Sequence, residues 1–138
     1  MKLYNVLSKK NYIDIKVILS SIVLSVFFIC SGCRSYPYIE NIVSSVPKDK
    51  TSVEVKTAIR EAASSKGWIL QETDDSSFIA ILPKENEIQV TIIISPRKYS
   101  INYLSSKGYK KEGNRIHPRY NKYVNNLNRE IQYYLTKN

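Results

Sequence analysis

Hydrophobic residues recur with two different periods along the chain, and the shift from one period to the other predicts its helices and strands. Between residues 51 and 66 one helical face collects the apolar side chains Val55, Ala58, Ile59 and Ala62. Thr51 followed three positions later by Glu54 is a capping box, and Gly67 is typical of the residue that ends a helix. The pattern predicts a capped helix from residue 51 to about residue 66.

Four runs with the two-residue alternation of β-strands follow this helix. They cover residues 68–73, 78–82, 87–95 and 99–104. The third run is the clearest, because four aliphatic residues occupy every second position: Ile88, Val90, Ile92 and Ile94. Connections of a few residues join neighbouring strands in antiparallel fashion, so we expect a four-stranded antiparallel meander.

A second amphipathic helix is predicted from Pro118 to the end of the chain. Its apolar side chains share about 100° of arc; they are Tyr120, Val124, Leu127, Ile131, Tyr134 and Leu135. The order helix, four strands, helix predicts a two-layer α+β domain over residues 51–138, with both helices on one face of the sheet. The opposite face would carry Ile69, Ile79, Ile81 and Ile93, and would need cover from the linker, a partner or a second copy.

The beginning of the chain has the three parts of an export signal. Four lysines precede an apolar run over residues 17–29, which holds ten apolar residues in thirteen, and small residues follow at Ser31 and Gly32. A membrane-spanning helix needs about 20 apolar residues, so this run is short for one. The alternatives are a signal-anchor helix with two incidental thiols and a secretory signal cut by the general peptidase.

The end of this segment, Cys30-Ser31-Gly32-Cys33, resembles the lipobox of bacterial lipoproteins. The resemblance implies removal of the signal peptide, residues 1–32, a diacylglyceryl group on Cys33, and an acylated, palmitate-type amino terminus. Cys30 stands where that family usually has an aliphatic residue. Each buried methylene contributes about 0.8 kcal/mol, so three acyl chains would give a lasting lipid anchor. Arg34, in place of the aspartate that retains such proteins in the inner membrane, implies the periplasmic face of the outer membrane.

The segment between the lipobox and the first helix has the composition of a linker. Residues 33–50 contain Pro37 and Pro47 and end in alternating charges, so we expect a lipidated terminus and a tether. Only residues 38–43 are apolar enough to dock on the domain.

Candidate catalytic groups are few. His117 is the only histidine, which excludes any site that needs two imidazoles. The sequence has no phosphate loop, nucleotide fingerprint or metal-ligand spacing, so we expect no cofactor and no metal. His117 is expected to satisfy backbone groups or to pack on Tyr120. An enzyme acting on envelope polymer or lipid would have to use His117 with Tyr120, Asn121 and Arg115.

Charge is distributed unevenly in this chain of formal net charge +9. Residues 34–94 hold seven basic and nine acidic residues, whereas residues 95–138 hold ten basic and two acidic, together with seven of the eleven tyrosines. Because export argues against nucleic acid, the expected partner is anionic phospholipid, lipopolysaccharide, peptidoglycan or an acidic envelope protein. Arg119, Lys122 and Arg129 share an outward arc of the last helix and are the candidate binding residues. The alternative is that they form only a solvated helix face.

Short motifs over residues 51–135 are similar to those of a family of small bacterial lipoproteins of uncharacterised activity. The motifs are Gly67-Trp68, Ile101-Asn102-Tyr103, Arg115-Ile116-His117 and Tyr120-Asn121. The resemblance implies a lipid-anchored envelope protein and supplies no catalytic residue. We therefore expect a non-enzymatic protein that binds or scaffolds another envelope component, with an envelope hydrolase that uses His117 as the alternative.

Overall fold

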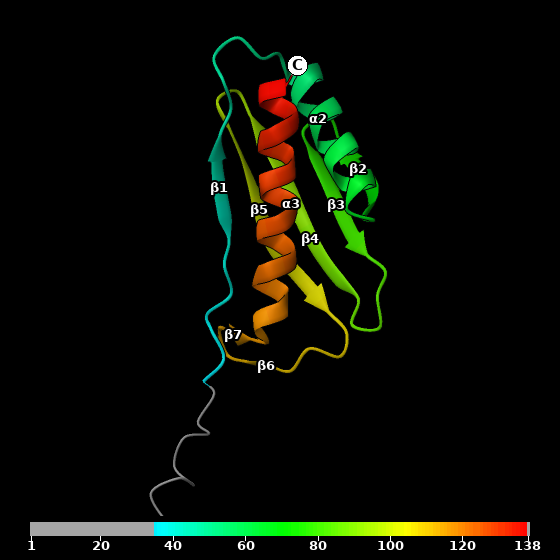
Figure 1. Cartoon of the computed structure of the whole chain (residues 1–138), viewed down its shortest axis with the longest axis vertical. Helices are drawn as coiled ribbons and strands as arrows, with labels where there is room; N and C mark the ends of the chain where they lie inside the picture. Colours follow the sequence, from blue (N-terminus) through cyan, green and yellow to red (C-terminus); the bar gives the residue numbers. More distant parts are fainter. Residues whose placement is uncertain (1–34, 138) are drawn as a thin grey trace, which may run out of the picture. The chain divides into compact units, whose positions relative to one another are not determined.

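The computed structural model describes residues 35–137, and a compact unit begins at Tyr36. Five antiparallel strands form a sheet in the order β1-β5-β4-β3-β2, and two helices cover one of its faces (Figure 1). The helices are α2 (Ser52–Ser65) and α3 (Pro118–Lys137). The sheet strands are β1 (Ile42–Ser45), β2 (Ile69–Asp74), β3 (Ser77–Leu82), β4 (Ile88–Ser95) and β5 (Lys98–Ser106). The predicted α+β class is confirmed. The predicted signal, Cys33 and Arg34 lie outside the described residues.

The prediction of four strands is wrong by one. Residues of the expected tether form β1, which pairs antiparallel with β5 and places Ile42 opposite Ile101. The sequence does not predict β1 because its four residues, which end in two serines, are too few to show the alternation of a strand. Its partner β5 also lies far along the chain. The segment between β5 and α3, for which the sequence predicts no helix or strand, contains a small hairpin of β6 (Lys111–Glu112) and β7 (Arg115–Ile116).

Helix α2 begins and ends as its sequence predicts. Glu54 N donates to Thr51 Oγ1 at 3.3 Å, and Thr51 N donates to Glu54 Oε2 at 2.8 Å, which completes the capping box. At the other end Gly67 has φ +72°, and Trp68 N donates back to Ala63 O at 2.8 Å. This Schellman turn directs Trp68 into the core, where it is 5% exposed.

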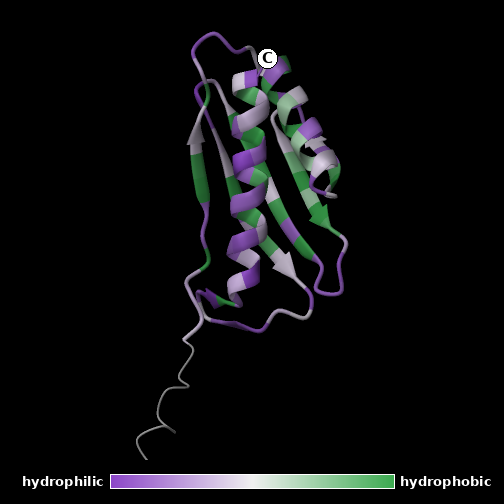
Figure 2. Ribbon diagram, viewed as in Figure 1, coloured by the Kyte–Doolittle hydropathy of each residue, from purple (hydrophilic) through white to green (hydrophobic). Residues whose placement is uncertain are grey.

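The hydrophobic core lies between the helices and the sheet. Hydrophobic residues gather on the strands, while the outward side of α3 is hydrophilic (Figure 2). The largest fully buried side chains come from both layers and include Ile59, Phe78, Ile92, Ile101, Leu127 and Ile131. The register also confirms that Ile69, Ile79, Ile81 and Ile93 share one face, because the residues that alternate with them are the ones in the core.

Four amide side chains lie along one side of α3 at intervals of four, three and four residues. We call them the amide row: Asn121, Asn125, Asn128 and Gln132. All four bind the segment over residues 38–45, which contains β1. The buried Asn121 makes two of these bonds, since its Nδ2 donates to Tyr38 O at 2.8 Å and its Oδ1 accepts from Glu40 N at 3.2 Å. Asn121 and Gln132 thus supply partners to backbone groups of this segment, whereas Asn125 and Asn128 bind the side chains of Glu40 and Ser44.

Two buried tyrosines differ in whether their hydroxyls have partners. Tyr99 OH donates to Asn128 Oδ1 at 2.6 Å and accepts from Gln132 Nε2 at 2.8 Å. Tyr120 OH is buried and has no hydrogen-bond partner among the described residues. Burial is the main cause that raises the pKa of both hydroxyls, so both stay protonated at neutral pH.

Replacing each of these tyrosines with phenylalanine should have opposite consequences. Tyr99→Phe removes one hydrogen bond from each of the two amides, which keep only their bonds to Ser44 and Ser45, and it should lower the free energy of unfolding by about 1–3 kcal/mol. Tyr120→Phe removes a hydroxyl that has no partner, so stability should stay the same or rise. Urea denaturation of the two variants, each compared with the unchanged domain, measures the difference. A larger loss from Tyr120→Phe would contradict the hydrogen-bond assignment.

Candidate functional site

The chain enters the domain beside the β6–β7 hairpin. Ile116 N donates to Pro37 O at 3.0 Å, and Ile39 N donates to Asn114 O at 2.8 Å. In Figure 1 this entry lies at the lower end of the domain, together with the turn between β3 and β4 and the start of α3, whereas the C-terminus lies at the opposite end. We call this end, formed by residues 36–39, 83–87 and 107–122, the basic end.

Positive charge is concentrated at the basic end. It holds seven basic residues, Lys84, Lys107, Lys110, Lys111, Arg115, Arg119 and Lys122, against three acidic ones, Glu85, Glu87 and Glu112. Two of the acids are paired: Glu87 with Lys107 at 3.1 Å and Glu112 with Lys110 at 2.8 Å. Hydrogen bonds from Gln89 and Lys107 lower the pKa of Glu87, and the bond from Lys110 lowers the pKa of Glu112, so both carboxyls stay ionised. The basic end therefore has a net charge of +4. The turns at the other end of the sheet, residues 47–51, 74–76 and 96–98, carry four basic and three acidic residues, a net charge of +1.

Aromatic rings hold several of these cations in place. The Lys84 ammonium lies 4.8 Å from the centre of the Tyr123 ring, and the Arg115 guanidinium lies 4.5 Å from that of Tyr38. Lys111 lies 4.9 Å from the Tyr103 ring centre. Such contacts contribute about 0.5–1 kcal/mol each at exposed sites, so they position the charges without neutralising them.

A hollow of about 280 Å³ opens at the basic end. It is lined by Lys84, Glu85, Asn86, Tyr109, Arg119 and Tyr123. Gly108 lets the loop after β5 contact the turn between β3 and β4, because a Cβ at this position would lie 2.0 Å from Asn86 Oδ1. Its φ of +77° is also a conformation that favours glycine. Two cations and two phenolic hydroxyls face this hollow against one carboxylate, Glu85, and this set of groups, with a net positive charge, suits a phosphate or phosphorylated headgroup.

The structure brings together two of the three basic residues selected from the sequence. Arg119 and Lys122 are exposed in the first two turns of α3, at the basic end. Arg129 is also exposed, but it lies ten residues after Arg119 on α3, which corresponds to about 15 Å along the helix and places it away from the basic end. Its guanidinium donates to Asn126 Oδ1. Sequence reasoning missed Lys84 and Tyr109 because they come from separate turns. Cys33, the predicted lipidation site, precedes the part of the chain that the structure describes.

The groups of the alternative enzymatic site make structural contacts instead of converging. His117 stacks on Tyr109 with ring centres 5.2 Å apart, not on Tyr120 as expected, and its Nδ1 accepts from Arg119 N at 3.3 Å. The expected backbone contact is therefore present. Arg115 Nη1 donates to Tyr36 O at 2.9 Å, and the Asn121 amide is bonded to backbone. Within residues 35–137 His117 has no hydrogen bond to the hydroxyl of a serine, threonine or tyrosine.

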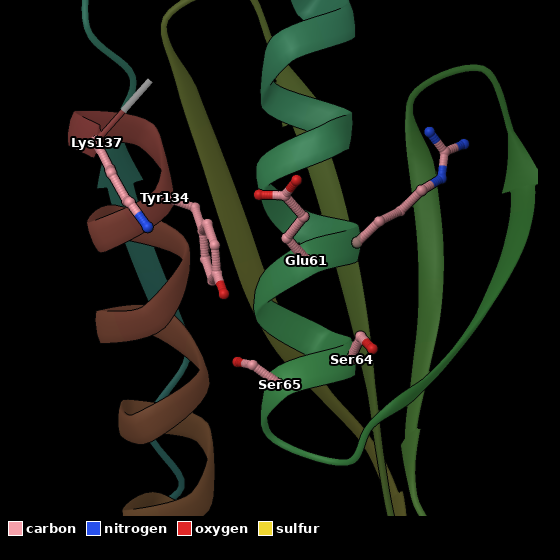
Figure 3. A pocket seen from close by; sticks show the side chains of 6 residues that line it. Glu61, Ser64, Ser65, Tyr134 and Lys137 are labelled. Atoms are coloured by element: carbon pink, nitrogen blue, oxygen red, sulfur yellow. The ribbon is translucent and has the colours of Figure 1, made fainter.

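A hollow of about 640 Å³ lies elsewhere, between α2 and α3 (Figure 3). Its lining residues are Arg60, Glu61, Ser64, Ser65, Tyr134 and Lys137. Ser65 Oγ donates to Ala62 O and to Glu130 Oε1. The only histidine precedes the first residue of α3, while Lys137 ends that helix about 30 Å away. This groove therefore has two serines but no imidazole to activate them.

Within residues 35–137 the structure has no helix that combines the length and the apolar character needed to cross a membrane. The chain matches no family model, and it has no significant match among curated proteins. The geometry of the basic end is therefore the main structural guide to function.

Proposed function

We propose that this is a lipid-anchored protein of the bacterial cell envelope whose domain binds an anionic membrane surface and has no catalytic role. The observation that carries the proposal is that the chain enters the domain at its basic end. Cys33 precedes Tyr36 by three residues, which span at most about 10 Å. Acyl chains on Cys33 would therefore keep the basic end close to the lipid headgroups.

The distances favour an electrostatic contribution from this end. The Debye length at physiological salt is about 8 Å, so charges within about 10 Å of the headgroups are only partly screened. Each basic residue close to an anionic leaflet contributes about 1 kcal/mol, which gives the net charge of the basic end a contribution of about 4 kcal/mol. The anchor supplies attachment in this proposal, and the charges supply orientation.

The anchor has a direct test. Cys33→Ser should abolish acylation and leave an uncut precursor, whereas Cys30→Ser should be tolerated because residue 30 is discarded with the signal. Metabolic labelling with a fatty acid analogue, followed by electrophoresis, measures both effects. Label retained on the Cys33→Ser chain would contradict the anchor.

Charge reversal on α3 tests the surface. Arg119→Glu should weaken binding of an unlipidated domain, residues 36–138, to anionic phospholipid vesicles by about 30-fold, since it changes two charges at about 1 kcal/mol each. Arg129→Glu is the matched control, on the same helix but away from the basic end, and should have a much smaller effect. Neither change should move the melting temperature much, because exposed charges contribute little to stability.

Vesicle co-sedimentation at several salt concentrations measures these affinities, with zwitterionic vesicles as the reference. Equal weakening by the two variants would contradict a specific role for the basic end, as would failure of the unchanged domain to bind anionic vesicles at low salt. Turnover of muropeptides or lipids that His117→Ala abolishes would overturn the non-enzymatic assignment.

A further inference from the structure

The sheet face that points away from the helices, which we call the open face, is apolar and almost free of charge. Six aliphatic side chains lie on it: Val43, Ile69, Ile79, Ile81, Ile93 and Leu104. The other central positions carry only glutamine, threonine, serine or asparagine. Charged residues stand at the ends of strands, as Asp74 and Lys98 do. An uncharged centre inside a polar rim is the usual composition of a protein interface.

Exposure of these side chains makes the open face unusual for a solvated sheet. Val43 is 66% exposed, Ile69 54%, Leu104 45% and Ile93 43%, and they account for four of the seven exposed large hydrophobic residues in the described part of the chain. A solvated face of an antiparallel sheet is normally polar. Both helices lie on the other face, so no described segment covers this one.

We propose that the open face packs against the same face of a second copy of this chain. A surface without central charge offers nothing to a charged partner, and burying a partner's charge against it would be costly. The complementary surface must itself be uncharged, and the open face meets that requirement. Two such faces can pack about 10 Å apart with their strands within about 30° of each other, as sheets do in β-sandwiches.

The symmetry of this pair agrees with membrane attachment, and this step rests on the proposed function. The strands run between the basic end and the opposite end of the domain (Figure 1). A two-fold axis parallel to the strands places both basic ends on the same side. Two copies anchored through Cys33 can therefore pair while both remain attached to one leaflet.

The size of the face predicts a weak dimer. Five strands about 4.8 Å apart, with about six residues each at about 3.4 Å, cover roughly 500 Å² on each copy, or roughly 1,000 Å² on the two copies together. Interfaces below about 1,200 Å² in total are typical of transient complexes. Confinement of both copies to one membrane raises their effective concentration, so the pair should form on the membrane and dissociate readily in dilute solution.

Cysteine cross-linking of the full-length chain in its membrane tests the pair. Thr91 lies near the middle of β4, the central strand, so Thr91→Cys in a Cys30→Ser background places one thiol at the centre of the open face. Ser64→Cys, exposed on α2, is the control for random collision. A short bis-maleimide should link two Thr91→Cys chains and leave the Ser64→Cys chains mostly monomeric.

A charge on the open face should remove this cross-link. Ile93→Glu, added to Thr91→Cys, buries a carboxylate in the interface, and Ile69→Glu on the edge strand β2 provides a second variant in case the first fails to fold. Val53→Glu is the matched control, since Val53 is 73% exposed on α2. Loss of the dimer band in both open-face variants but not in Val53→Glu supports the proposal.

Equal cross-linking of Thr91→Cys and Ser64→Cys, or a dimer band that persists in the folded open-face variants, overturns it. Fatty acid label on the same bands reports on the anchor separately. Loss of the label contradicts the proposed function, whereas absence of the cross-link in labelled Thr91→Cys chains that carry no added charge contradicts only the paired faces.

Discussion

A domain that begins at residue 49 is expected to be less stable than one that begins at Tyr36 by on the order of 5 kcal/mol. The shorter fragment lacks β1 and with it the buried Val46 and the partly buried Ile39 and Ile42. Burial of such side chains contributes about 1.5–3 kcal/mol each when complete, and every amide left without a partner costs about 1–3 kcal/mol more. Small domains have a total stability of about 5–15 kcal/mol, so much of the shorter fragment should be unfolded.

Urea denaturation followed by circular dichroism compares the two fragments. Lys48→Ala in the longer fragment is the control, because it changes an exposed side chain in the same segment and leaves β1 in place. The sequence predicts a domain over residues 51–138 that is complete without residues 33–50, which are expected to form a tether. A shorter fragment that unfolds cooperatively, with a free energy within about 1 kcal/mol of the longer one, would restore that prediction and show that β1 is dispensable.

Leu127→Ala is expected to lower the free energy of unfolding by about 2–5 kcal/mol. Leu127 is fully buried in the middle of α3, where that helix faces the sheet, so the substitution leaves a cavity in the core. Tyr133→Ala is the matched control, because it removes a larger side chain from the same helix at a position that is 51% exposed.

The control should change stability by less than about 0.5 kcal/mol, as exposed substitutions usually do. Thermal or urea unfolding of residues 36–138 measures both variants. Similar losses from Leu127→Ala and Tyr133→Ala would show that α3 does not pack on the sheet through the face that carries Leu127.

Elements with local signals could be predicted from the sequence. The ends of α2 depend on Thr51, Glu54 and Gly67, all within or next to the helix, and the structure confirms each of them. The two faces of the sheet also follow from local alternation, which places Ile79 and Ile93 on one face and Phe78 and Ile92 on the other. In such cases the residues that determine the structure are neighbours in the chain, so the pattern is visible without knowledge of the fold.

Features that depend on distant partners could not be predicted. Asn128 and Gln132 have the spacing of solvent-facing helix residues, and nothing in an amide distinguishes one that meets water from one that meets a strand. Asn121 binds Tyr38, which lies 83 residues earlier in the chain. The candidate site has the same origin, since Arg119 meets Lys84 and Tyr109 only after three separate segments come together. Sequence periodicity could group Arg119 only with residues of its own helix.

The position of β1 has a mechanical consequence for a protein held by its amino terminus. In the proposed attachment, tension between the lipid and the domain would act along β1, parallel to the strand and perpendicular to its hydrogen bonds with β5. In this shear geometry the backbone bonds and the bonds from the amide row resist together, whereas a strand pulled sideways would lose them one at a time. The joint between anchor and domain should therefore withstand force better than a strand of four residues suggests.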